Sequence, residues 1–91
     1  MFVKSLAGDR GMIFPYNPPV EATFWMKNTL IPLDMLFIRG DGTIVRIAAN
    51  TTPLSLAPVG AGEPVSAVLE IRSGRSAELG IREGDIASWT H

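Results

Sequence analysis

The chain of 91 residues contains no cysteine, and its single histidine is the last residue, His91. Without cysteine the fold has no disulfide, and no thiolate is available as a nucleophile or a metal ligand. A histidine at a chain end leaves no Ser-His-Asp triad and no histidine-based metal cluster. The sequence therefore predicts no bound metal and neither a zinc-dependent nor a triad-type hydrolase.

Long hydrophobic runs and clusters of one charge are also missing. No apolar run approaches the roughly 20 residues that a membrane span requires. Eight Lys and Arg face nine Asp and Glu, and the basic residues are scattered from Lys4 to Arg82. No phosphate-cradling loop and no dinucleotide-binding glycine motif occurs. We therefore expect no membrane span, no nucleic-acid binding and no cofactor.

What the sequence does contain is a series of short apolar segments between nine glycines and seven prolines. These residues leave little room for long helices, and their spacing is typical of a compact β domain. A chain of this length buries one modest core. We predict a single domain over residues 1–91 with a mostly β fold, a small antiparallel barrel or curled sheet with one short helix.

The first predicted strand rests on alternation. From Val20 to Lys27 apolar and polar residues alternate, which predicts a half-buried antiparallel strand with Trp25 on its polar face. The residues that precede prolines in the segment 14–19 are pushed out of the helical region. We therefore expect a loop in that segment.

The strongest prediction is a hairpin from Leu33 to Ala48, in which an apolar run and a second strand flank the turn Gly40-Asp41-Gly42. The two glycines supply the positive φ angles that a tight turn needs. The segment from Asn50 to Pro64 has no period and predicts a long ordered loop. A further strand is expected from Val65 to Ile71.

The C-terminal part predicts a short helix and a last strand. Residues Arg75 to Leu79 can form one or two helical turns, closed by Gly80 in a left-handed conformation. Asp85 is expected to accept backbone N–H bonds and so to close the turn before the strand Ile86 to Trp89.

The most distinctive segment of the chain runs from Phe24 to Ile38. It resembles the Phe-Trp-Met-Lys-Asn-Thr and Pro-Leu-Asp core of the domain of unknown function 192 family. Further elements of that family follow in the same order and cover nearly the whole chain: Ser5-Leu6-Ala7, Arg10-Gly11-Met12-Ile13-Phe14, Gly40-Asp41-Gly42, Val68-Leu69-Glu70-Ile71 with Gly74, and Gly80-Ile81 with Gly84-Asp85. The resemblance implies a small β-rich domain without a known reaction. Because such domains are often found in exported bacterial or archaeal proteins, it also suggests an extracytoplasmic location.

Members of that family usually carry a further segment, with an opening strand, before the position of Met1. Relative to the family we therefore expect the chain to be truncated at its N-terminus. The loss of a strand from a sheet would leave open N–H and C=O groups along one edge. We expect a homodimer through this edge, or a monomer that aggregates.

A candidate ligand site lies in the distinctive segment. Its side chains are an indole ring, an ammonium, an amide, a hydroxyl and a carboxylate, from Trp25, Lys27, Asn28, Thr29 and Asp34. Tryptophan supplies a stacking surface, and the amide and hydroxyl can orient a ligand by hydrogen bonds. The alternative is structural, with Trp25 covering the end of the barrel and Asn28-Thr29 satisfying the backbone of the turn.

Three roles are open for Asp34. It can pair with Lys27, it can act as a base or ligand anchor whose pKa is shifted by burial, or it can accept hydrogen bonds from backbone groups around Asn28 and pin the turn. We favour the pinning role because buried polar groups usually serve structure.

Glu70 is the second carboxylate of interest, at the end of an apolar strand. It can pair with Arg72 or Arg75, or it can serve in catalysis. Exposed ion pairs are common, so we favour the pair.

Three functions follow. The first is a noncatalytic module that binds a small molecule or peptide near the Trp25 to Asp34 turn, with the Asn50 to Pro64 loop as a lid. The second is an interaction domain whose exposed strand edge accepts an extended segment of a partner. The third is an enzyme that uses Asp34 or Glu70 as an acid or base.

Overall fold

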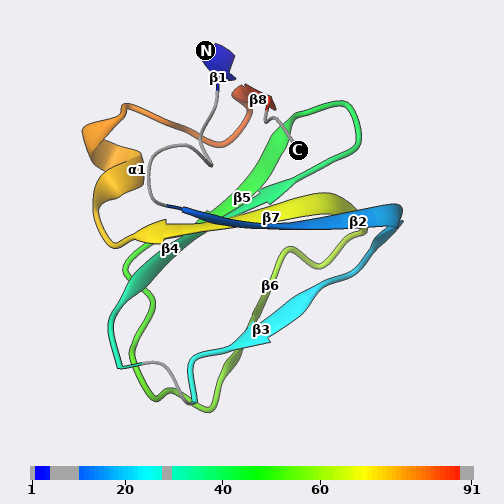
Figure 1. The fold of residues 1–91 in the computed structure, drawn as a ribbon. Coiled ribbons are helices and arrows are strands. Elements are labelled where there is room, and N and C mark those ends of the chain that lie inside the picture. The colour runs from blue at the N-terminus through cyan, green and yellow to red at the C-terminus, as the bar shows by residue number, and fades with distance from the viewer. Residues whose placement is uncertain (1, 5–10, 28–29, 89–91) are drawn as a thin grey trace.

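The structure is a computed structural model that describes residues 2–4, 11–27 and 30–88 (Figure 1). Strands dominate these residues and one short helix accompanies them, which confirms the predicted mostly β fold. In chain order the elements are β1 (Phe2–Lys4), β2 (Met12–Val20), β3 (Thr23–Trp25), β4 (Leu33–Ile38), β5 (Ile44–Ala48), β6 (Pro58–Gly60), β7 (Val65–Arg72), α1 (Arg75–Glu78) and β8 (Ile86–Ser88).

A four-stranded sheet with the order β2-β7-β4-β5 forms the centre of the fold, and its neighbouring strands are antiparallel. The antiparallel pair β3-β6 lies on one side of this sheet, and the parallel pair β1-β8 lies on the other (Figure 1). None of the sheets formed by the described residues closes on itself. Of the two predicted forms, the curled sheet is therefore the one observed.

Two hydrophobic clusters cover opposite faces of the central sheet. Side chains alternate along β4, so Leu36 and Ile38 join one cluster while Met35 and Phe37 join the other. The first cluster also takes in Ile81 and Ala87 from the C-terminal part. Because both faces of β4 are covered, its side chains are apolar almost throughout, as expected for an interior strand.

The predicted hairpin is confirmed. β4 and β5 pair with Met35 opposite Ala48, and the turn is closed by a 2.9 Å hydrogen bond from Gly42 N to Arg39 O. Of the two turn glycines, only Gly42 has a positive φ, 91°. A Cβ atom at Gly42 would lie 2.8 Å from the carbonyl oxygen of Ala87, so the close approach of the last strand also requires glycine here.

The expected loop in residues 14–19 is wrong. β2 continues to Val20, although its pairing with β7 shifts register between Pro15 and Val20. β2 is an edge strand, where a proline that lacks an N–H group is tolerated. The predicted Asn50 to Pro64 loop is also too long, because it contains β6.

The predicted strand from Val20 to Lys27 is shorter, with β3 limited to Thr23–Trp25. From Ala22 onward the predicted faces hold, because Ala22 and Met26 are buried while Trp25 and Lys27 are exposed. Val20, expected on the buried face, is exposed and belongs to β2.

The C-terminal predictions hold where the chain is described. α1 ends at Glu78, and Gly80 follows with a φ of 68°. Asp85 Oδ2 accepts a 2.8 Å hydrogen bond from the backbone N of Arg82, which closes the turn before β8. Trp89 lies outside the described residues. No helix in the described part of the chain is long and apolar enough to cross a membrane.

Candidate functional site

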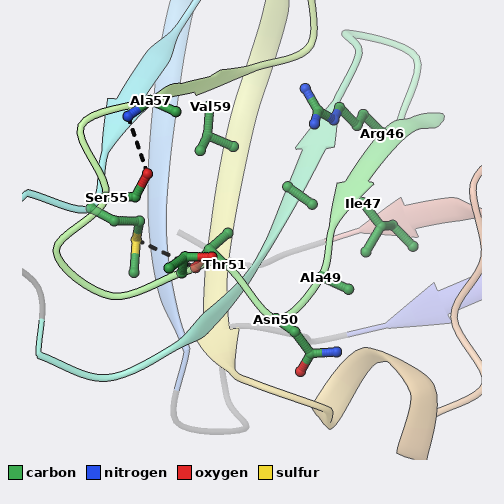
Figure 2. Close-up of a pocket in the computed structure, with 11 residues that line it drawn as sticks. Arg46, Ile47, Ala49, Asn50, Thr51, Ser55, Ala57 and Val59 are labelled. Atoms are coloured by element: carbon green, nitrogen blue, oxygen red, sulfur yellow. Dashed lines mark hydrogen bonds between the residues drawn. The ribbon is translucent and has the colours of Figure 1, made fainter.

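A pocket of about 370 Å³ opens beside the end of β5. Its lining comes from residues 46–52, from Ser55, Ala57 and Val59 across the opening, and from Met26 of the distinctive segment (Figure 2). The loop before β6 keeps its shape through a 3.1 Å hydrogen bond from Ala57 N to Ser55 Oγ. The pocket therefore lies between a regular strand and a loop with internal hydrogen bonds.

Thr51 joins this pocket to the distinctive segment. Its backbone N donates to Leu33 O at 2.9 Å, and its hydroxyl oxygen accepts from Leu33 N at 3.1 Å. The hydroxyl group also lies 3.0 Å from Leu33 O and 3.3 Å from the sulfur of Met26, so its one proton has two acceptors within reach. The buried Thr51 thus fixes the pocket residues 50–52 against Leu33 and Met26.

Asp34 fixes Asn50, the residue before Thr51, through a hydrogen bond from a buried position. Its side chain is fully buried, at 0% exposed. One oxygen accepts hydrogen bonds from Asn50 N at 2.9 Å and Gly74 N at 3.3 Å. The other accepts from the backbone N of Ser76 at 3.0 Å and from its hydroxyl at 2.6 Å. Asp34 therefore holds two segments, the one that follows β5 and the one that follows β7. Both of these strands are neighbours of β4 in the sheet.

The charge of Asp34 is stabilised by these donors. Burial raises the pKa of the carboxyl, but the hydrogen bonds from Ser76, Asn50 and Gly74 outweigh it and leave the pKa below its ordinary value. Asn50 itself has a φ of 52°, and its side-chain oxygen accepts a hydrogen bond from the Ser73 hydroxyl. The pocket wall at Asn50 is thus held through both its backbone and its side chain.

Arg46 supplies the charge of the pocket. Among the lining residues in the described part of the chain, it alone carries a formal charge. Its guanidinium donates one hydrogen bond to the carbonyl of Gly60, which places it across the opening from β5 to β6. The remaining lining combines hydroxyl and amide groups with apolar side chains, so the pocket favours a ligand with an anionic end and an apolar body.

Of the five ligand-binding residues predicted from sequence, the structure describes Trp25, Lys27 and Asp34. Trp25 is exposed on β3, where it pairs with Pro58 of β6, and Lys27 is also exposed. Asn28 and Thr29 lie outside the described residues. Asp34 is buried, and within the described ranges it forms no ion pair with Lys27. Asp34 does pin the backbone, but its donors belong to residues 50, 74 and 76.

The predicted pairing of Glu70 is wrong. Arg72 and Arg75 instead bind Glu78, with N–O distances of 3.2 and 3.1 Å. Glu78 lies on α1, which begins shortly after the end of β7. This places the carboxylate of Glu78 in contact with both arginines. Glu70 is half-buried on β7, and burial raises the pKa of its carboxyl.

Sequence reasoning missed Thr51 and Arg46. Both are residue types that occur on any surface loop or strand, and their partners lie far away in the sequence. The only local signal is the polar segment Asn50-Thr51-Thr52 between an apolar strand and Pro53. That pattern predicts a loop, and it does not indicate which hydroxyl is buried.

The sequence profile of the domain of unknown function 192 family, described as "Uncharacterized ACR", matches residues 1–89. The chain belongs to this family. Within the domain of unknown function 192 fold seen here, the distinctive Phe24 to Ile38 segment reaches the pocket through Met26 directly and through the hydrogen bonds of Leu33 and Asp34.

Two solved structures are similar to this chain. One is a protein of unknown function from Novosphingobium aromaticivorans DSM 12444, with 42% identity and a TM-score of 0.81, where the match covers 97% of this chain and 72% of that chain. The other, from Sinorhizobium meliloti 1021, is described as a "putative transcription regulator". It has 35% identity and a TM-score of 0.76, and the match covers 91% of this chain and 74% of that chain. No curated protein matches.

Proposed function

We propose that this protein is a noncatalytic module that binds a small molecule in the pocket beside β5. The observation that carries the proposal is the pocket itself, at about 370 Å³ and joined to the family's distinctive segment through Thr51. Small-molecule sites are typically concave, measure roughly 300–1,000 Å³ and combine apolar walls with a few polar groups. The lining described above has this composition.

The ligand class that fits is a small carboxylate with an apolar body. The guanidinium of Arg46 carries more N–H groups than its single bond to Gly60 uses, and a planar fork of N–H donors suits a carboxylate. Met26 and Val59 offer apolar contact nearby. The segment between β5 and β6 forms one wall, and its role as a lid stays a prediction.

Asp34 is proposed as a positioning residue. Both of its oxygens already accept hydrogen bonds from the protein, so it orients Asn50 and leaves ligand contact to the residues of the pocket. Ligand binding by Trp25, Lys27 and the segment 28–29 stays a prediction, as do the enzyme that uses Asp34 or Glu70 and the peptide ligand.

The strand-edge alternative is less well supported by the geometry. β2 forms one edge of the central sheet, and three of its residues, Pro15, Pro18 and Pro19, have no N–H group to offer a partner strand. Binding of an extended segment and a homodimer through an edge therefore stay predictions.

Amide NMR spectra of the ¹⁵N-labelled protein test the pocket. Acetate, butyrate and benzoate are titrated in parallel with the corresponding neutral amides. We expect the carboxylates to shift resonances of residues 46–52 and 55–59, and the amides to shift them less. Ala49→Phe places a ring in the pocket opening and should abolish the shifts, whereas Ala77→Phe, on the exposed face of α1, should leave them unchanged.

Two results would contradict the proposal. One is an absence of shifts with every carboxylate in the panel. The other is equal shifts in the Ala49→Phe and wild-type proteins, since binding would then lie elsewhere.

A further inference from the structure

Large apolar side chains gather at the end of the molecule that carries β3 and the loop before β6. We name Trp25, Leu30, Ile31, Leu54 and Leu56 the apolar end. Their exposed fractions run from 55% for Leu54 to 80% for Leu30, so each leaves more than half of its surface in water. Monomeric soluble domains rarely expose so many large apolar side chains together without an interaction that covers them.

The backbone places these residues on neighbouring segments. Trp25 lies opposite Pro58 in the β3-β6 pair, two residues after Leu56. Thr51 is hydrogen-bonded to Leu33, two residues after Ile31. In Figure 1 both segments occupy the end of the molecule farthest from β1 and β8. The apolar end therefore comes from two segments, one around residues 25–33 and one around residues 51–58. They are joined at one end by the pairing of Trp25 with Pro58 and at the other by the hydrogen bonds between Leu33 and Thr51.

The charges at this end are distributed unequally. Residues 23–33 and 49–59 contain no Asp or Glu, and their one charged residue is Lys27, which is exposed. All nine carboxylate side chains of the chain lie in other segments. The two segments thus combine aliphatic side chains, a tryptophan and one ammonium, and they contain no carboxylate side chain.

We propose that the apolar end docks on a lipid bilayer with anionic headgroups. Tryptophan favours the level of the headgroups, and aliphatic side chains gain by entering the acyl boundary. Lys27 is attracted to an anionic surface, and no carboxylate at this end opposes it. A second copy is a poorer occupant, because a two-fold contact through this face would put two Lys27 ammonium groups into one interface to which these segments contribute no carboxylate.

This proposal is independent of the small-molecule pocket, and vesicle binding tests it. The full chain is sedimented with phosphatidylcholine vesicles, with and without phosphatidylglycerol. We expect binding to the anionic vesicles, weakened about fivefold by Lys27→Ala. The double change Leu54→Ser and Leu56→Ser should weaken binding by about a hundredfold, roughly tenfold for each leucine withdrawn from the membrane. In a Trp89→Phe background the emission of Trp25, the remaining tryptophan, should shift to the blue.

Two control variants distinguish docking through the apolar end from docking through β2 or through the pocket. Met12→Ser removes an equally exposed apolar side chain on β2, outside the apolar end, and should leave vesicle binding unchanged. Ala49→Phe should block the pocket but leave vesicle binding intact. Circular dichroism should show that the variants at Met12, Lys27, Ala49, Leu54 and Leu56 are folded, because these side chains are exposed.

Four outcomes would overturn the proposal. They are an absence of binding to anionic vesicles, a loss with Met12→Ser as large as with the double leucine variant, a loss with Ala49→Phe alone, and a dimer that the double leucine variant dissociates while vesicles bind neither protein.

Discussion

Asp34→Asn tests the role of the buried carboxylate most directly. The change keeps the size of the side chain but replaces one acceptor oxygen by an NH₂ group. Four donors now point at the carboxylate, from Asn50, Gly74 and, twice, Ser76. An asparagine can accept on one side only, so on the other side its amide hydrogens meet N–H groups.

The least costly arrangement turns the NH₂ group toward Ser76, whose hydroxyl can rotate and accept a hydrogen bond. The backbone N–H of Ser76 then has no acceptor, at about 1–3 kcal/mol, and the bonds from Asn50 and Gly74 lose the contribution of the charge. We expect the free energy of unfolding to fall by about 3 kcal/mol. For a domain of this size, such a loss lowers the midpoint of thermal unfolding by roughly 15 °C.

The pH dependence gives a second readout. The pKa of Asp34 is lowered in the folded protein, so its stabilisation is complete above the unfolded value of about 3.9 and is lost as the pH falls through the folded pKa. The wild-type protein should therefore lose stability as the pH falls below about 4. The Asp34→Asn protein should lack this part of the acid destabilisation.

Urea unfolding followed by circular dichroism measures both effects. Asp41→Asn is the matched control, because Asp41 is exposed and accepts a turn hydrogen bond from Thr43 N. Its cost should stay below about 1 kcal/mol. Two results would contradict this role of Asp34. One is a loss of unfolding free energy with Asp34→Asn no larger than that with Asp41→Asn. The other is an equal loss of stability in acid for the wild-type and Asp34→Asn proteins.

Three further changes have defined outcomes in the same unfolding assay. Glu70→Gln should raise stability at neutral pH by about 0.5 kcal/mol and leave it unchanged in acid. The reason is that burial raises the pKa of Glu70, so the folded protein loses stability as the pH rises and this carboxyl becomes charged. A loss of stability at neutral pH would contradict this. Thr51→Val should cost about 1–3 kcal/mol, since Leu33 N loses its acceptor, and a neutral effect would show that water replaces the hydroxyl. Gly42→Ala should cost about 3 kcal/mol against about 1 kcal/mol for Gly62→Ala, because both have a positive φ but only Gly42 faces a backbone oxygen at 2.8 Å, and equal costs would contradict the close approach.

Local signals in the sequence predicted the elements that local interactions determine. The Leu33 to Ala48 hairpin follows from an apolar run, a glycine turn and a second strand, and the helix ending before Gly80 follows from its left-handed cap. β6 carries no alternation of its own, and forms where β3 offers a pairing partner. β2 runs through its prolines because it lies at an edge of the sheet, a position that the sequence does not reveal.

The candidate site was less predictable because its contacts join distant segments. The distinctive segment contributes Met26 to the lining of the pocket, and its Asp34 accepts a hydrogen bond from Asn50 N. Asp34 was expected to bond near Asn28, but its donors lie 16, 40 and 42 positions away. Separations of this size depend on strand order, which puts the ends of β5 and β7 beside the start of β4.

The apolar faces of β4 leave a question of strand alignment that Asp34 answers. A strand with one polar face cannot slip by one residue without burying that face, but apart from Asp34 the residues of β4 are apolar on both faces and lack this protection. In the observed alignment Asp34 lies opposite Ile71, and its oxygens meet the N–H groups of Gly74 and Ser76 just beyond the strand. A slip of two residues would move those groups by about 6.6 Å, out of hydrogen-bonding range. A single buried carboxylate therefore favours one alignment of β4, a strand whose remaining side chains are all apolar.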